Sequence, residues 1–555
     1  MRSFVTFFTL LVTSPCLWAQ LPTIEFAGVT QPVVQKNTQV QLEVTGTFVD
    51  EPAELLFSDS ALQAVAVPPS TAPFEEAKSS ARFGLRVPTE VPSGLHQVRM
   101  RGRFGVSNPR PLLVVDKPVE IAQIPQSANA PLRTDCIYFG HFAPRDRVSF
   151  SVQLSPGEVF SCRAYTTQLD SQAIPAMALY DPSAGEICRA RGIEDWPAEF
   201  SWTAQVAGSY TVVLHDFLYR GGNEFAFVLE GIVTSPESAT QVSIDKWLRP
   251  SSRRKVTSCR ELALNEDERA TVSGSTAQAQ NTSDTQTYQV PFAVAGNLQS
   301  GIPNQFDFEV KAGQQLRLDV CSQELGRLTD PRLYLFQHPA TGETAGTMPL
   351  LSERDDEPGF GGPELLLPSK DPSLDWHAPQ DGIYRVAVLD NESGQRPVDS
   401  TEFILRVSPP RPDFELFAYR PFPTNNPAGA RPMGSNLLRG GTEVVRLLVN
   451  RKHGYAGPID IEVLGLPDQI TCSALSIPPD ANSGVLILAA AEDAPAWCGS
   501  LSIVGKGATQ SRLIERNAQP HAVSAKASAE MNRVHSRACD DLVILVNDND
   551  VAPLS

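Results

Sequence analysis

Phe306-Asp-Phe-Glu-Val-Lys-Ala-Gly-Gln-Gln-Leu-Arg-Leu-Asp-Val320 contains two runs of alternating apolar and polar residues, joined at Gly313. Successive side chains of a strand point to opposite faces, so this alternation predicts two strands that each bury one face. An earlier stretch has the same character: Phe150-Ser-Val-Gln-Leu-Ser-Pro-Gly-Glu-Val-Phe-Ser-Cys-Arg-Ala164. The sequence therefore predicts a β fold in which one unit occurs twice.

The spacing of landmarks supports this duplication. Three pairs of residues are each 156 positions apart: Phe150 with Phe306, Gly157 with Gly313, and Pro175 with Pro331. A later pair of strand-like segments, 208–216 and 382–390, is 174 positions apart, and the added length falls within residues 352–375. Insertions collect in loops while strands keep their spacing, so we expect both copies to adopt one fold.

These motifs carry a family resemblance. Phe-x-Phe-x-Val-x-Ala-Gly-Gln at 306–314, Asp330-Pro331, Asp355-Asp356 and Asp381-Gly-Ile-Tyr at 381–384 resemble the bacterial pre-peptidase C-terminal (PPC) domain. The first copy departs from the pattern, because it has Ile174-Pro175 and lacks the Asp-Asp pair. The resemblance implies a compact, non-catalytic, jelly-roll-like β-sandwich of the kind attached to secreted proteases and other exported bacterial proteins.

Breaks in the pattern divide the chain of 555 residues into several parts. Short strands at regular intervals, punctuated by 46 Pro and 37 Gly, are typical of sandwiches, and the flanking regions resemble immunoglobulin-like (Ig-like) domains. The predicted all-β order is: signal peptide 1–19, Ig-like or IPT/TIG-like sandwich 20–116, PPC-like sandwich 117–233, linker 234–284, PPC-like sandwich 285–408, Ig-like sandwich 409–512, and irregular tail 513–555 with one strand.

Composition and charge bear on location and partners. The apolar run at 4–12 followed by Ala19 is typical of a secretory signal peptide, so we expect a secreted, periplasmic or extracellular protein. No later apolar run reaches the roughly 20 residues that span a bilayer, which predicts no transmembrane segment in the mature chain. The net charge of −17 disfavours nucleic acid as a partner.

Motifs of common hydrolases are absent from the sequence. It contains no subtilisin-type triad motifs, no Gly-x-Ser-x-Gly, no His-Glu-x-x-His and no phosphate-binding Gly-rich loop. His215 occupies a strand position that points away from the core and is expected to be an exposed structural histidine rather than a catalytic base. We therefore expect a non-catalytic binding, cell-surface or extracellular structural protein. The alternative is the accessory portion of a secreted subtilase-type serine protease, or a protein classed with such proteases because of its modules.

The expected partner is an extracellular or cell-surface polysaccharide or protein. Loop aromatics such as Tyr219, Tyr419 and Phe422 could contact such a ligand, although packing within or between domains is the other interpretation.

One candidate metal site stands out in the second copy. Asp355 and Asp356 lie in a Gly-rich loop, and Asp330 and Asp390 end neighbouring predicted strands. Carboxylate oxygens that converge at one end of a sandwich suit Ca²⁺, so calcium is a candidate ligand although no cofactor is required. The alternative is a set of acidic turn residues that face water.

Eight cysteines remain after Cys16, an even number that is compatible with disulfides in an oxidising compartment. Cys472 and Cys498 lie in the same predicted sandwich and are the favoured pair, although sequence does not fix connectivity.

Overall fold

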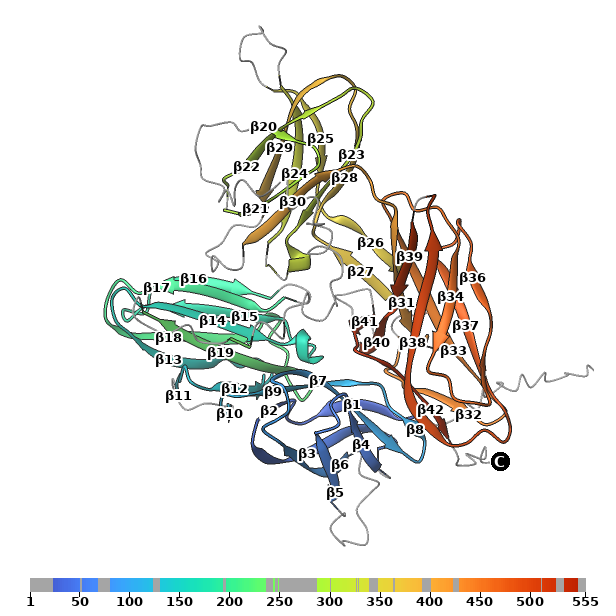
Figure 1. The fold of residues 1–555 in the computed structure, drawn as a ribbon. Coiled ribbons are helices and arrows are strands. Elements are labelled where there is room, and N and C mark those ends of the chain that lie inside the picture. Colours follow the sequence, from blue (N-terminus) through green and yellow to red (C-terminus); the bar gives the residue numbers. More distant parts are fainter. Residues whose placement is uncertain are drawn as a thin grey trace, which may run out of the picture.

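The computed structural model confirms an all-β chain of tandem sandwiches (Figure 1). It describes residues 23–547, with gaps at 50–51, 68–79, 123–129, 193–195, 236–242, 245–247, 249–286, 300, 326, 328, 339–347, 363–364, 392–400, 423–428, 511 and 526–533. The predicted signal peptide and most of the predicted linker lie outside the described residues. Among the described residues, no helix has the length and hydropathy needed to cross a bilayer.

The first sandwich packs two sheets around a core that includes Phe26, Leu42, Phe83 and Met100. One sheet has the order β1 (Glu25–Val29), β3 (Thr38–Thr47), β6 (Ser80–Val87), β5 (Gln63–Val67). The other has β2 (Val33–Gln35), β9 (Arg110–Val115), β7 (Gly94–Gly102), β4 (Pro52–Phe57), with β8 (Gly105–Val106) paired to β7.

The second sandwich has two five-stranded sheets. One has the order β11 (Ala130–Pro131), β13 (Val148–Leu154), β18 (Gly208–Asp216), β15 (Pro175–Tyr180), β16 (Glu186–Arg191). The other has β10 (Val119–Ile121), β12 (Ile137–His141), β19 (Ala226–Thr234), β14 (Val159–Tyr165), β17 (Ala198–Thr203). The single-turn 3-10 helix η1 (Thr167–Leu169) connects β14 to β15.

The third sandwich repeats this strand order. One sheet has β20 (Thr287–Gln289), β22 (Asn304–Val310), β29 (Gly382–Asp390), β24 (Pro331–Gln337), β25 (Leu350–Arg354). The other has β21 (Phe292–Asn297), β30 (Glu402–Ser408), β23 (Gln315–Cys321), β28 (Ser373–His377), and η2 (Gln323–Leu325) follows β23. Each strand has its counterpart in the second sandwich at the same place in chain order, with β10 as an additional edge strand there.

The glycine of the central motif explains how the two sheets connect. β22 and β23 belong to opposite sheets, so the turn at Gly313 crosses the sandwich, as the turn at Gly157 does between β13 and β14. Both glycines have positive φ, 76° and 87°, a backbone conformation that favours glycine. The N–H of Gly313 donates to the carbonyl oxygen of Ala378, and the N–H of Gly157 donates to that of Ala204, both at 2.8 Å.

The matching strands β18 and β29 keep two further details in common. Tyr210 and Tyr384 are buried, and each donates its hydroxyl hydrogen to the carbonyl of the residue four positions earlier. Asp216 and Asp390 are also buried, and each accepts the backbone N–H of the residue before the proline of the neighbouring strand. The two sandwiches thus share internal hydrogen bonds as well as strand order.

The additional length of the third sandwich forms a hairpin. β26 (Glu357–Gly362) and β27 (Leu365–Ser369) pair with each other and reach toward the fourth sandwich (Figure 1). Leu365 is buried against Phe417 and Tyr419 there, and the rings of Phe360 and Phe417 lie 6.0 Å apart. The insertion therefore supplies an apolar contact between two sandwiches.

The fourth sandwich includes residues that we predicted to be an irregular tail. One sheet has β35 (Ile470–Cys472), β37 (Ser483–Ala490), β33 (Thr442–Lys452), β31 (Asp413–Tyr419), β40 (Gln519–Ala525), β41 (His535–Ala538). The other has β32 (Ser435–Leu438), β42 (Leu542–Asn547), β38 (Trp497–Ala508), β34 (Ile459–Leu464), β36 (Leu475–Ile477), with β39 (Leu513–Asn517) paired to β38.

The tail prediction is therefore wrong, because residues 513–547 contribute β39, β40, β41 and β42. The buried positions of β40 are His521 and Val523, a mixture of polar and apolar residues that a hydrophobic pattern does not detect. Only the strand predicted at 541–546 is correct, and it docks on the preceding sandwich as β42.

Contacts between distant parts of the chain join three sandwiches. Val33, Leu113, Phe139 and Val228 share one apolar cluster between the first and second sandwiches, together with Leu248 from the linker region. The side chain of Asn436 in the fourth sandwich makes two hydrogen bonds with the backbone of Val106 in the first. Both contacts involve strands of the first sandwich, which therefore lies against the second and the fourth.

A buried ionic triad connects the same three sandwiches. Asp170, which follows η1, lies between Arg110 of β9 and Arg537 of β41, and all three side chains are at most 6% exposed. Arg110 Nη1 lies 3.1 Å from Asp170 Oδ2, and Arg537 Nε lies 3.0 Å from Asp170 Oδ1. Arg110 also donates to the carbonyl oxygens of Phe26 and Ser524. One carboxylate thus pairs with two guanidinium groups from different sandwiches.

Candidate functional site

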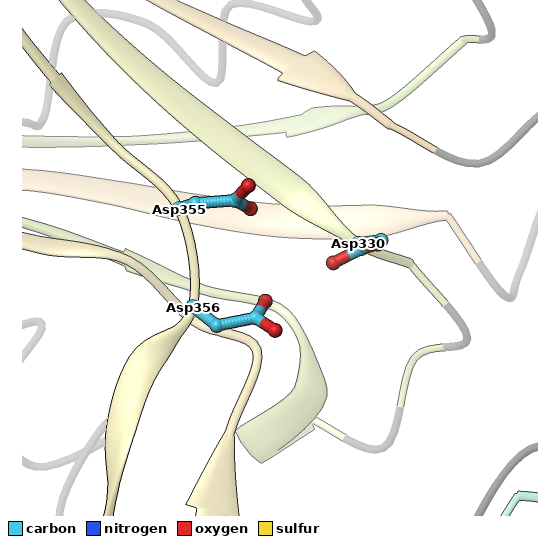
Figure 2. A group of neighbouring side chains, drawn as sticks. All are labelled: Asp330, Asp355 and Asp356. Atoms are coloured by element: carbon cyan, nitrogen blue, oxygen red, sulfur yellow. The ribbon is translucent and has the colours of Figure 1, made fainter.

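Three of the four predicted metal ligands come together at one end of the third sandwich. Asp330 directly precedes β24, while Asp355 and Asp356 form the turn between β25 and β26. One carboxylate oxygen of each lies within 4.8 Å of those of the other two. Figure 2 shows the side chains of Asp355 and Asp356 pointing toward Asp330. The β25–β26 turn positions two of these groups because the inserted hairpin begins there.

Cationic and amide groups already contact this acidic cluster. Lys370 Nζ lies 3.4 Å from Asp330 Oδ2, and Arg332 Nη2 lies 3.5 Å from Asp355 Oδ2. Asn391 donates its side-chain N–H to Asp355 Oδ1 at 3.1 Å. Two positive charges therefore compensate part of the three negative charges, and the remaining charge is about −1 when all three carboxylates are ionised.

Two observations fit a cation at the cluster. Asp330 Oδ1 is buried and has no hydrogen-bond partner among the described residues. The pKa of Asp356 is raised, mainly because its own carboxyl group is partly buried and secondly because the negative charge of Asp330 is close. A buried acceptor without a donor and two carboxylates that oppose each other's ionisation are both stabilised by a bound cation.

The fourth predicted ligand, Asp390, does not join the cluster. Its side chain is buried, and Oδ1 accepts the backbone N–H of Asp330 at 3.0 Å. Tyr384, Val386 and Val388 of the same strand are buried too, so Asp390 continues the inward-facing series of β29. The prediction of Asp390 as a metal ligand is therefore wrong, because its carboxylate stabilises the start of β24 instead.

The predicted Cys472–Cys498 disulfide is not formed in the structure, where both residues are thiols. Cys472 lies on the edge strand β35, and Cys498 lies on β38 of the opposite sheet. The sequence placed both residues in one sandwich, but the strand order that separates them depends on long-range pairing.

The histidine that we singled out has a structural environment. The ring of His215 stacks on that of Tyr219 with 4.5 Å between centroids, and its Nδ1 lies 2.9 Å from the carbonyl oxygen of Asp216. The guanidinium group of Arg147 lies over the Tyr219 ring, 5.5 Å from its centroid. His215 thus belongs to a surface packing cluster.

A histidine–carboxylate pair that the sequence did not reveal lies in the third sandwich. His338 Nε2 is 3.1 Å from Asp307 Oδ1, and the carboxylate is buried. Arg385 binds both oxygens of the same carboxylate, with Nε at 2.6 Å and Nη2 at 2.8 Å. Burial opposes ionisation of Asp307, but the hydrogen bonds from Arg385 and His338 outweigh it and lower its pKa. The carboxylate therefore serves mainly as the partner of an arginine.

Two of the three loop aromatics considered as ligand contacts are buried. Tyr419 is 2% exposed at the hairpin contact, and Phe422 is 6% exposed in a small apolar cluster with Val523. Tyr219 is half-buried beneath His215 and Arg147. Of the two interpretations, packing is the one that the structure supports for Tyr419 and Phe422.

Comparisons with known proteins give little further information. No family model matches the chain, and no curated protein matches it. Among solved structures, a crystal structure of tripeptidyl peptidase 2 matches with 11% sequence identity and a TM-score of 0.14. That match covers 92% of this chain and 41% of the other, so this chain spans well under half of that peptidase.

Proposed function

We propose that the protein is an exported, non-catalytic binding or extracellular structural protein, built around two copies of one PPC-like module. The observation that carries the proposal is the shared interior of the second and third sandwiches. The turn glycines, the buried tyrosines and the buried aspartates make equivalent hydrogen bonds in both. Such correspondence, together with nine equivalent strands in each of the two sandwiches, supports duplication of one module.

The candidate site residues of these modules support a binding function rather than hydrolysis. The most acidic candidate site is a cluster of carboxylates beside cations, and the buried carboxylate of Asp307 is paired with Arg385 as well as with His338. The function proposed for these modules is to present surfaces to an extracellular or cell-surface polysaccharide or protein. Two copies of such a surface on one chain increase avidity when the partner is a polymer.

Incubation of the purified full chain with casein tests the rival function as an autonomous protease. We expect no turnover above a buffer control. Hydrolysis that a serine-directed inhibitor abolishes would overturn the non-catalytic proposal. Retention of the protein on insoluble surface polymers from the producing cell would support the binding role, and a protein that neither cleaves casein nor is retained would contradict binding to such polymers.

We further propose that Asp330, Asp355 and Asp356 hold Ca²⁺. Three carboxylates with partial compensation by Lys370 and Arg332 are a modest ligand set, so a dissociation constant of about 10⁻⁴ to 10⁻³ M, as in extracellular modules, is expected. The ion would supply a partner to Asp330 Oδ1 and connect the start of β24 to the β25–β26 turn.

Calorimetric titration of the full chain with Ca²⁺ checks this prediction. Asp356→Asn should weaken binding about tenfold or more, because it removes one of three charged ligands. Asp375→Asn is the matched control, since Asp375 is an exposed carboxylate of the same sandwich that pairs with Arg317 outside the cluster. Absence of heat in the wild-type protein, or equal affinity in Asp356→Asn, would contradict a calcium site here.

A further inference from the structure

A cavity lies at the junction of the first and fourth sandwiches. Its volume is about 40 Å³, and its walls include Arg99 and Pro109 from the first sandwich and Arg420, Arg431 and His521 from the fourth. A site for one water molecule needs roughly 10–15 Å³ measured in this way. The cavity is therefore large enough for a group of several non-hydrogen atoms.

Positive charge dominates the walls of the cavity. Arg99, Arg420 and Arg431 contribute guanidinium groups, and the acidic lining residue is Asp541, which pairs with Arg99 at 2.6 Å. Arg420 and Arg431 also have carboxylate partners, at 3.2 Å and 3.1 Å respectively.

Those two partners, Glu443 and Glu25, lie outside the lining of the cavity. The arginines line the cavity, whereas the carboxylate partners of Arg420 and Arg431 do not. Three arginines thus line one cavity in a chain whose net charge is −17.

One hydrogen-bond donor at this site lacks an acceptor. Arg420 uses Nε to contact Glu443, whereas its Nη1 is buried and has no hydrogen-bond partner among the described residues. Burial of an N–H donor without an acceptor is unfavourable, and a guanidinium group is shaped to bind two oxygens of one oxyanion. An oxyanion in the cavity would satisfy this donor and reduce the repulsion among the three arginines.

We propose that the cavity binds a small oxyanion group, such as a carboxylate or a sulfate, with Arg420 as its hydrogen-bond donor. Arg99 and Arg431 supply the surrounding positive potential. Because residues from both sandwiches line the cavity, the bound group also strengthens the junction between β8 and β42. The group can come from a free ion or from an acidic sugar of a larger ligand. This proposal does not depend on the proposed function.

Titration of the full chain with sulfate at constant ionic strength, balanced with chloride, tests the proposal by thermal denaturation. We expect a melting temperature that rises and then saturates, since binding to the folded state stabilises it by mass action. Arg420→Gln should weaken the apparent affinity about tenfold to a hundredfold, the usual effect of losing a charged hydrogen-bond donor. Arg189→Gln, a highly exposed arginine of the second sandwich paired with Glu186, is the control and should behave as wild type.

Sulfate also stabilises proteins in general, but that effect rises without saturation and is common to all variants. A non-saturating increase of equal slope in the wild type, Arg420→Gln and Arg189→Gln would overturn the proposal. If Arg420→Gln fails to fold, calorimetry on the wild-type protein decides, since saturable heat with sulfate is expected and its absence overturns the site. Glucuronate in place of sulfate, with glucose as the neutral control, distinguishes an acidic sugar from a free inorganic ion as the source.

Discussion

Replacing Asp170 with alanine should lower the free energy of unfolding by about 3–5 kcal/mol, the usual cost of leaving buried charges without their partner. Arg110 and Arg537 are 6% and 5% exposed and both depend on this carboxylate, so its removal places two positive charges side by side in a buried junction. Chemical denaturation of the full chain, followed by intrinsic fluorescence, measures the loss. The effect should appear in the transition that includes the first, second and fourth sandwiches.

Asp135→Ala is the matched control for this variant. Asp135 also pairs with an arginine of the second sandwich, Arg133, but its side chain is 66% exposed, so the denaturation curve should not change. A triple variant in which Asp170, Arg110 and Arg537 all become apolar residues of similar size should recover much of the stability, because no charge then remains buried. If the Asp170→Ala protein is as stable as the wild type, the triad does not hold the three sandwiches together.

Asp216→Ala should destabilise the second sandwich by about 3 kcal/mol or more, because one buried carboxylate accepts several hydrogen bonds. Oδ1 accepts the backbone N–H of Ile174 at 2.8 Å, and Oδ2 accepts the N–H groups of Leu218 and Arg220 at 3.1 and 2.9 Å. The guanidinium of Arg220 binds both oxygens as well. Asp181→Ala is the control, since Asp181 caps an exposed turn of the same sandwich.

The same carboxylate predicts a pH dependence. Burial opposes ionisation of Asp216, but the hydrogen bonds from Arg220 and the N–H of Ile174 outweigh it, so its pKa is lowered in the folded protein. A lowered folded pKa adds stability above the unfolded pKa, about 4, and that stability is lost as the pH falls through the folded value. Melting temperatures between pH 7 and pH 3 should fall more steeply for wild type than for Asp216→Asn. Parallel profiles would contradict this origin of the acid sensitivity.

Periodicity predicted the strands of the central modules well because each one alternates buried and exposed side chains. The Phe306–Val320 stretch, for example, becomes β22 and β23 around the Gly313 turn. The same periodicity also indicates the position of Asp390. Tyr384, Val386, Val388 and Asp390 alternate with outward-facing residues, which places Asp390 inside the sandwich and away from the acidic turn. Asp330, Asp355 and Asp356 could be grouped because turns at one end of a sandwich converge.

Other features could not be predicted from local sequence patterns. Arg110, Asp170 and Arg537 come from three sandwiches, and their contact depends on how those sandwiches pack together. β40 pairs in parallel with β31, about 100 residues earlier, and its short sequence contains few apolar residues. Arg420 and Arg99 face one cavity although they are more than 300 residues apart. Such long-range pairings are decided by tertiary packing, which outweighs local propensity.

The position of β42 constrains when the fourth sandwich can fold. This strand lies inside its sheet, paired with β32 on one side and with β38 on the other. Until the ribosome has released residue 547, β32 and β38 each present an unpaired edge, and such edges promote aggregation. The fourth sandwich can therefore be completed only once residue 547 has left the ribosome, and the edges of β32 and β38 that pair with β42 stay open until then.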